Sequence, residues 1–163
     1  MLVSQIKKIN PEVVFLHAGE HDVRVEQGTD ALFDNYKQLI WKLLESTSTK
    51  ICISLIIPVL VHPDLNELIM GFNNKLTKFI TDVRRQRHYK NRIYTCSNDS
   101  LAVFMKRSVE ADGVKLSLSV HGERRLWLRL RDSISTALDI NAKISSRRDR
   151  SHSSTSHSSL HHE

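Results

Sequence analysis

Three ionisable side chains follow one another a few residues after an apolar run near the start of the chain. The run covers residues 13–16, and Glu20, His21 and Asp22 come after it. Carboxylates and an imidazole can transfer protons near neutral pH, and they are also common metal ligands. Chemistry in open parallel α/β sheets collects at the carboxyl ends of the strands. The three residues therefore form a catalytic group, a metal site, or only a polar loop that follows a strand.

A metal site is one alternative at this loop. His17, His21 and Asp22 are the candidate ligands. Their spacing on an extended segment does not place the three side chains on one side of the chain. We therefore expect no metal ion and no cofactor.

A second polar stretch follows much later in the chain. Residues 111–126 read ADGVKLSLSVHGERRL, which we interpret as a loop that contains Asp112 and Lys115 and leads into a final helix. His121 is expected to be an exposed residue at the start of that helix. Ser97 and Ser100 follow another apolar run, but no glycine there permits the sharp turn that exposes a nucleophilic serine.

The elements that must position these loops can be predicted from the spacing of apolar residues. Continuous apolar runs rich in β-branched residues predict buried strands at 12–17, 50–60 and 92–96. Apolar residues recur at helical spacing over 30–46, where Asp30 is available as a cap, over 66–86, and again after Gly122. The order β-α-β-α-β-loop-α predicts an α/β domain with a parallel sheet and right-handed crossovers.

These stretches together resemble the SGNH (GDSL-like) esterase and lipase family. In that family the third block is a strand followed by G-x-N-D, and the fifth is D-G-x-H-x-S-x-x-G before the C-terminal helix. PEVVFLHAGEHDV is similar to the third block and DGVKLSLSVHG to the fifth. The resemblance covers about residues 5–138. It implies a three-layer α/β/α fold with a parallel sheet, SGNH-like or flavodoxin-like.

The chain departs from the family's pattern at the residues that carry the chemistry. Gly19 and Asp22 match the third block, but His21 stands in place of the oxyanion asparagine. Asp112 matches the triad aspartate, whereas Lys115 replaces the general-base histidine. The family's nucleophilic serine and its oxyanion glycine belong to two earlier blocks that would precede this sequence. The resemblance thus implies a partial domain that lacks the first strands.

A lysine at its ordinary pKa cannot take the place of that histidine. An ammonium group with a pKa of about 10.4 stays protonated near neutral pH, and a neighbouring aspartate favours the charged form. We therefore expect an SGNH-like pseudoenzyme without ester hydrolysis. The alternative is part of an active ester hydrolase whose serine lies upstream.

A formal net charge of +6 raises the question of nucleic-acid binding. Basic residues concentrate at 84–92 and 124–131, and the C-terminal tail adds more. Each segment is either the solvated face of a helix or a weak nucleic-acid surface. SGNH-like domains occur in proteins encoded by retrotransposons. The resemblance therefore implies a second alternative function, that of a nucleic-acid-associated module in a transposon-derived protein.

The composition divides the chain into a domain and a tail. Residues 1–142 have the apolar content of one domain, whereas 143–163 are rich in Ser, His and Arg and are expected to be disordered. Cys52 and Cys96 lie in apolar runs, which favours buried thiols over a disulfide or a metal site. Without a signal peptide or a membrane-spanning run, we expect an intracellular, cytoplasmic protein.

The first predicted strand also predicts an interaction. Without a partner strand on its outer side, residues 12–17 would form an apolar edge with no internal proline or lysine. Such edges pair readily with other chains, so we expect self-association through this strand.

Overall fold

The computed structural model describes residues 2–19, 22–23, 28–110 and 113–138. The helices are α1 (Leu2–Ile9), α3 (Gly28–Ser46), α4 (Pro63–Arg85) and α5 (Val120–Ala137), with a 3-10 helix η1 (Asp99–Phe104). The strands are β1 (Val13–Leu16), β2 (Lys50–Ser54), β3 (Ile93–Cys96), β4 (Met105–Glu110) and β5 (Gly113–Leu118). From β1 to β3 the chain alternates strands and helices, as the apolar and helical patterns predict.

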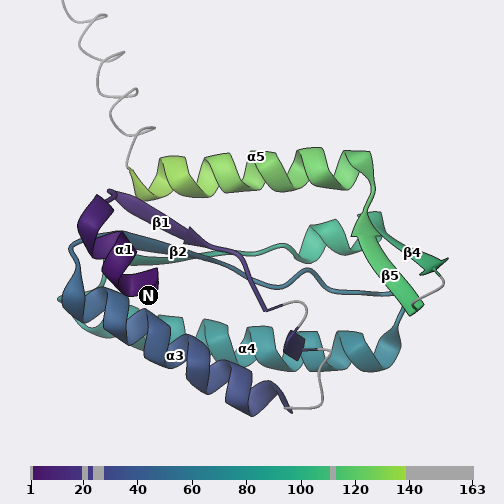
Figure 1. Cartoon of the computed structure of the whole chain (residues 1–163), viewed down its shortest axis with the longest axis horizontal. Coiled ribbons are helices and arrows are strands. Elements are labelled where there is room, and N and C mark those ends of the chain that lie inside the picture. Colours follow the sequence, from purple (N-terminus) through teal and green to yellow (C-terminus); the bar gives the residue numbers. More distant parts are fainter. Residues whose placement is uncertain (1, 20–21, 24–27, 111–112, 139–163) are drawn as a thin grey trace, which may run out of the picture.

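The strands β1, β2 and β3 form a parallel sheet in that order, which confirms the prediction of an α/β fold. Phe15 pairs with Cys52, and Cys52 pairs with Tyr94. All of β2 after Lys50 is buried, which explains why its sequence is apolar without alternation. α3 and α4 lie on one side of the sheet and α5 lies on the other (Figure 1).

The apolar stripes predicted for the first two long helices pack against each other. Tyr36 of α3 lies edge-on to Phe72 of α4, with 5.5 Å between the ring centres. The prediction that Asp30 caps α3 is wrong, because the helix already begins at Gly28. Asp30 instead lies in the first turn of α3, where its carboxylate pairs with Lys75 of α4.

The predicted strand 50–60 is wrong in its second half, because β2 ends at Ser54. Residues 55–59 are buried but irregular, so their backbone groups need partners other than a neighbouring strand. Asn73 supplies two of them, since its side chain bonds Ile56 N–H at 3.0 Å and Ile56 O at 2.8 Å. Two further contacts are those of Asn66 with Val59 N–H at 3.0 Å and of Asn98 with Leu55 O at 2.5 Å.

The structure also differs from the prediction between β3 and the last helix. Where a loop was expected, β4 and β5 pair as an antiparallel hairpin. The hairpin lies at the end of the molecule where β1, β2 and β3 terminate (Figure 1). The alternation of apolar and polar residues over 114–118, after an Asp-Gly pair, is a hairpin signal.

Candidate functional site

The carboxyl ends of the three parallel strands bring together one polar side chain each. His17 follows β1, Ser54 ends β2 and Asn98 follows β3. His17 Nδ1 lies 2.8 Å from Ser54 Oγ, and Asn98 Nδ2 donates to the same oxygen at 2.7 Å. We call these three residues the carboxyl-end cluster. It lies where parallel α/β sheets place their sites.

These hydrogen bonds determine how the Ser54 hydroxyl is used. Because the Asn98 amide donates to Ser54 Oγ, the hydroxyl proton can point to His17 Nδ1 when the imidazole carries its own proton on Nε2. A serine that donates to an imidazole is the first contact of a nucleophile and its base. The cluster therefore contains the serine and the histidine of a catalytic triad, but they are joined through Nδ1 and not through Nε2, the nitrogen that faces the nucleophile in the Ser-His-Asp template.

Two features oppose nucleophilic chemistry at this cluster. Ser54 is 1% exposed and Asn98 is 0% exposed, so a substrate carbonyl has no open route to Ser54 Oγ. Within the described residues no carboxylate bonds the other ring nitrogen of His17, so the third part of a triad is absent from them. What the cluster does in this structure is tie together the ends of three strands.

The loop after β1 contains the predicted site residue that the structure explains most directly. Gly19 has a φ of 97°, which favours glycine, and it is buried against Ile56. Tyr36 Oη donates to Ala18 O at 2.7 Å and so holds the same turn from α3. Burial raises the pKa of Tyr36 to about 12, and the charge of Asp22 adds to the shift. Asp22 itself is exposed.

The remaining predicted site residues are only partly covered by the structure. Glu20, His21 and Asp112 lie outside the described residues. Lys115 lies in β5, where it is paired with Ser108 of β4, and its side chain is outside the described part. The influence of Asp112 on Lys115 stays a prediction.

The two serines after β3 are engaged in fixing their own loop. Ser97 Oγ donates to Asp99 Oδ2 at 2.7 Å, and Ser100 Oγ accepts from Arg129 Nη2 at 2.6 Å. Arg129 also donates to Ser97 O at 2.9 Å, so α5 holds this loop from above the sheet. Ser97 lies in the loop before η1, as expected, whereas Ser100 lies within η1.

The structure gives no support to a metal site in the part that it describes. There, no three His, Cys, Asp or Glu side chains gather as ligands. Cys52 and Cys96 are free and buried, which confirms their prediction as buried thiols. Burial raises the pKa of Cys52 to about 12, so this thiol stays protonated and unreactive near neutral pH.

The structure separates basic residues that are close together in the sequence. Arg92 stabilises the fold, because its guanidinium donates to the carbonyl of Leu44 in α3 and to those of Thr47 and Thr49 in the segment after α3. On α5, Arg124 and Arg131 share one helical face with Trp127, which is 71% exposed. Arg125 and Arg129 lie on a different face of the same helix.

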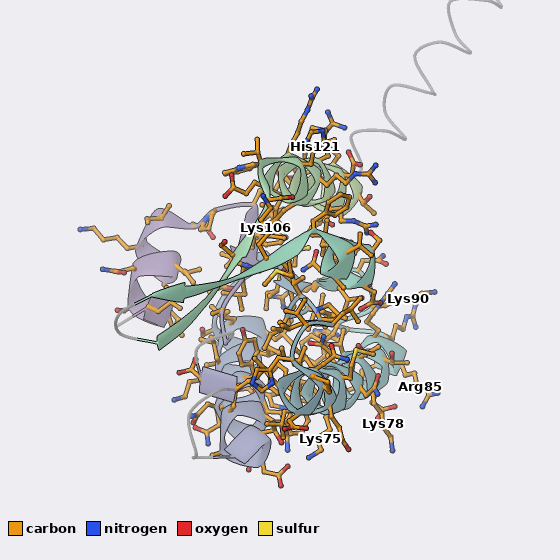
Figure 2. The ribbon with its side chains drawn as sticks, turned by 90° about the vertical axis from the view of Figure 1, so that its right-hand side faces the viewer. Lys75, Lys78, Arg85, Lys90, Lys106 and His121 are labelled. Atoms are coloured by element: carbon orange, nitrogen blue, oxygen red, sulfur yellow. The ribbon has the colours of Figure 1, made fainter. Side chains whose placement is uncertain are left out.

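Five other cations of the two basic segments line two grooves. A groove of about 430 Å³ is lined by Thr81, Arg84, Arg85 and Lys90. A second groove of about 540 Å³ lies between β3 and α5 and includes Arg125 and Arg129. Figure 2 shows Arg85 and Lys90 projecting outward on the same side of the molecule as Lys78.

Sequence reasoning did not single out the carboxyl-end cluster. The only local signal is Ser54, a polar residue at the end of an otherwise apolar run, where a buried hydroxyl requires a partner. The sequence analysis identifies His17 only as a candidate metal ligand. The contact of Ser54 with His17 and Asn98 depends on the order of the strands, which no local pattern specifies.

Comparison with known proteins adds no family to these observations. Among the helices of the described residues, none is both long enough and apolar enough to cross a membrane. No protein-family model matches the chain, and neither a curated protein nor a solved structure matches it significantly.

Proposed function

We propose that this chain is an α/β domain of the SGNH type that does not hydrolyse esters. The proposed architecture is the three-layer α/β/α arrangement of that family, with the parallel sheet between helices. In this proposal the domain is a pseudoenzyme, and the polar residues at the carboxyl end of its sheet stabilise the fold.

One glycine supports the assignment to this type of domain. Gly19, at the glycine position of the third block, adopts a positive φ three residues after β1. A positive φ favours glycine, so this position has its own conformational reason for the residue that the family has there. Gly122 lies two residues beyond the last glycine of the fifth block, where this chain has Val120, so it does not support the assignment.

The burial of the Ser54 side chain is the main observation that supports the proposed loss of ester hydrolysis. Ser54 contacts a histidine, as a nucleophile would, but the residue is 1% exposed. Nucleophilic attack needs the reacting atoms within about 3 to 3.5 Å of each other, and a buried hydroxyl offers a substrate no such approach.

Lys115 supports the same proposal from the other block. The family's base must be neutral near pH 7 to accept a serine proton, whereas an ordinary lysine is charged there. The change of residue type thus removes the proton acceptor at that position, whatever nucleophile is present.

Hydrolysis of p-nitrophenyl acetate by the purified chain tests the proposal. We expect no rate above that of buffer, and no change in Ser54→Ala, His17→Ala or Lys115→His. Turnover that Ser54→Ala and His17→Ala both abolish, while the control Ser97→Ala leaves it intact, would overturn the proposal and identify a Ser54–His17 dyad. Activity that appears in Lys115→His alone would favour the alternative of an ester hydrolase with a serine elsewhere.

A further inference from the structure

Cations from two distant segments flank β3, one of the two outer strands of the described sheet. We define the β3-edge surface as the residues Arg84, Arg85, Lys90, Tyr94, Arg125 and Arg129. The first three line one groove and the last three line the other. The Arg84 guanidinium lies 6.0 Å from the centre of the Tyr94 ring, so Tyr94 joins the two grooves. Arg85 and Lys90 mark this side of the molecule in Figure 2.

Two of the arginines are held in place by aromatic rings and not by carboxylates. Arg84 lies against Tyr94, and the Arg125 guanidinium lies 5.2 Å from the centre of the Phe104 ring. Neither arginine forms an ion pair with a carboxylate of the described residues, and both are exposed. Stacking positions a guanidinium while leaving its N–H groups for an anionic ligand.

Three carboxylates of the described residues lie near this surface, and each already has a partner. Asp82 pairs with Arg85 at 2.8 Å, and Asp132 pairs with Arg131 at 2.9 Å. Asp99 accepts a hydrogen bond from Ser97 Oγ at 2.7 Å. The five cations of the β3-edge surface therefore exceed these three carboxylates, and the surface is complementary to a polyanion.

The edge of β3 adds neutral hydrogen-bonding groups between the cations. The carbonyls of Arg92 and Cys96 accept from Ile51 N–H and Leu55 N–H, so the backbone groups of Thr95, which is exposed, point away from β2. Those of Ile93 point the same way, but Ile93 is fully buried and offers them to no ligand. Thr95 adds a hydroxyl to the groove beside α5, whereas the hydroxyls of Ser97 and Thr136 already donate to Asp99 Oδ2 and Asp132 O. Phosphate oxygens accept from backbone N–H and hydroxyl groups as well as from arginine.

We propose that the β3-edge surface binds single-stranded nucleic acid, with phosphates in the two grooves and a base against Tyr94. Basic grooves combined with an aromatic ring are the features that sequence-independent single-strand sites share. An acidic peptide would use the cations but has no use for the ring. The inference is independent of the proposed loss of ester hydrolysis, because neither groove contains Ser54 or His17.

Fluorescence anisotropy of labelled oligothymidylate and oligouridylate, each of about 20 nucleotides, tests the proposal with the full chain. With about three phosphate contacts, the affinity should fall about 20-fold between about 50 and 200 mM salt. Arg84→Gln combined with Arg125→Gln removes one cation from each groove. This variant should bind at least about tenfold more weakly at low salt, and its affinity should fall only about 3-fold over the same range.

The matched control is Lys7→Gln combined with Lys8→Gln, which removes the same charge from exposed positions of α1. It should change the affinity by less than about 2-fold. Tyr94→Leu should weaken oligonucleotide binding about 5-fold or more but leave the binding of inorganic polyphosphate unchanged. Thermal unfolding of each variant shows whether the fold is retained.

Four results would overturn the proposal. These are the absence of salt-dependent binding, an equal loss in the control, equal competition by polyglutamate, and equally tight binding of a duplex. Binding that survives Arg84→Gln/Arg125→Gln but is lost in Arg147→Gln/Arg148→Gln/Arg150→Gln would assign the affinity to the tail and would contradict it as well.

Discussion

At the scale of single residues, Asn73 supplies hydrogen bonds that a neighbouring strand would otherwise provide. The segment after β2 is buried yet unpaired, and the Asn73 amide bonds both backbone groups of Ile56. A buried N–H or C=O without a partner costs about 1 to 3 kcal/mol, so this contact decides whether the segment can stay in the core.

Replacement of Asn73 by leucine should therefore be strongly destabilising. Leucine has a similar size but leaves Ile56 N–H and C=O unsatisfied, so the free energy of unfolding should fall by about 2 to 6 kcal/mol. Urea unfolding measures the change. The exposed neighbour Asn74 is the control, and Asn74→Leu should change the free energy by less than about 0.5 kcal/mol. Equal effects at the two positions would show that the contact with Ile56 is not important.

Tyr36 predicts a dependence of stability on high pH. Its pKa is raised to about 12 by burial, with a further contribution from Asp22, whereas an unfolded tyrosine ionises near pH 10. The contribution of Tyr36 is fully present below about pH 10 and is lost as the pH rises toward 12, because the unfolded chain releases the proton first. The free energy of unfolding should fall by about 2 to 3 kcal/mol more in the wild type than in Tyr36→Phe. Identical pH profiles would contradict the assignment.

At the scale of elements, the close approach of α5 to η1 explains the glycine in its first turn. Ser119 caps the helix by accepting from Gly122 N–H at 3.2 Å, which places Gly122 against the residues before it. A Cβ at Gly122 would lie 2.7 Å from Phe104 Cβ and 2.9 Å from Leu118 Cδ2. Any larger residue must therefore move α5 away from the hairpin.

Gly122→Ala should destabilise the protein by about 1 to 3 kcal/mol, because the added methyl group overpacks this contact. Gly71 provides a control in another helix, since an added Cβ there meets nothing within 4 Å. Gly71→Ala should stabilise the protein by about 0.5 to 1 kcal/mol through helix propensity. Thermal unfolding distinguishes the two signs, and a neutral Gly122→Ala would show that α5 is free to shift.

The outer edge of β1 predicts self-association of the chain. β1 is the other outer strand of the described sheet, and all four of its residues are only half-buried. Such an apolar edge can pair with a second copy. Sedimentation at several concentrations should show association, and Phe15→Lys should weaken it about tenfold or more. The control Leu68→Lys, at an exposed apolar residue of α4, should leave it unchanged. A monomer at every concentration would contradict the prediction.

At the scale of the whole molecule, local burial patterns predict most of the architecture. The apolar runs 12–17 and 92–96 contain β1 and β3, and the helical repeat over 30–46 lies within α3. These elements could be predicted because a strand buried on both faces, or a helix buried on one, imposes a spacing that can be read locally. The buried thiols could be predicted for the same reason.

The candidate site could not be predicted in this way, because it depends on contacts between distant segments. Ser54 meets His17 and Asn98 only through the order of three strands. Residues 55–59 are as apolar as a strand, and only the distant Asn73 and Asn66 show why they leave the sheet. In the same way, composition cannot distinguish an arginine that holds α3, such as Arg92, from one that lines a groove.

The claim that Ser54 is closed to substrates can be tested most directly with a fluorophosphonate that reacts with activated serines. After incubation with the native chain, intact-mass spectrometry should show no adduct, and the same result is expected for Ser54→Ala and His17→Ala. A single adduct on the native chain, mapped to Ser54 and absent from His17→Ala, would contradict the account, because it would show a nucleophile that is both accessible and activated.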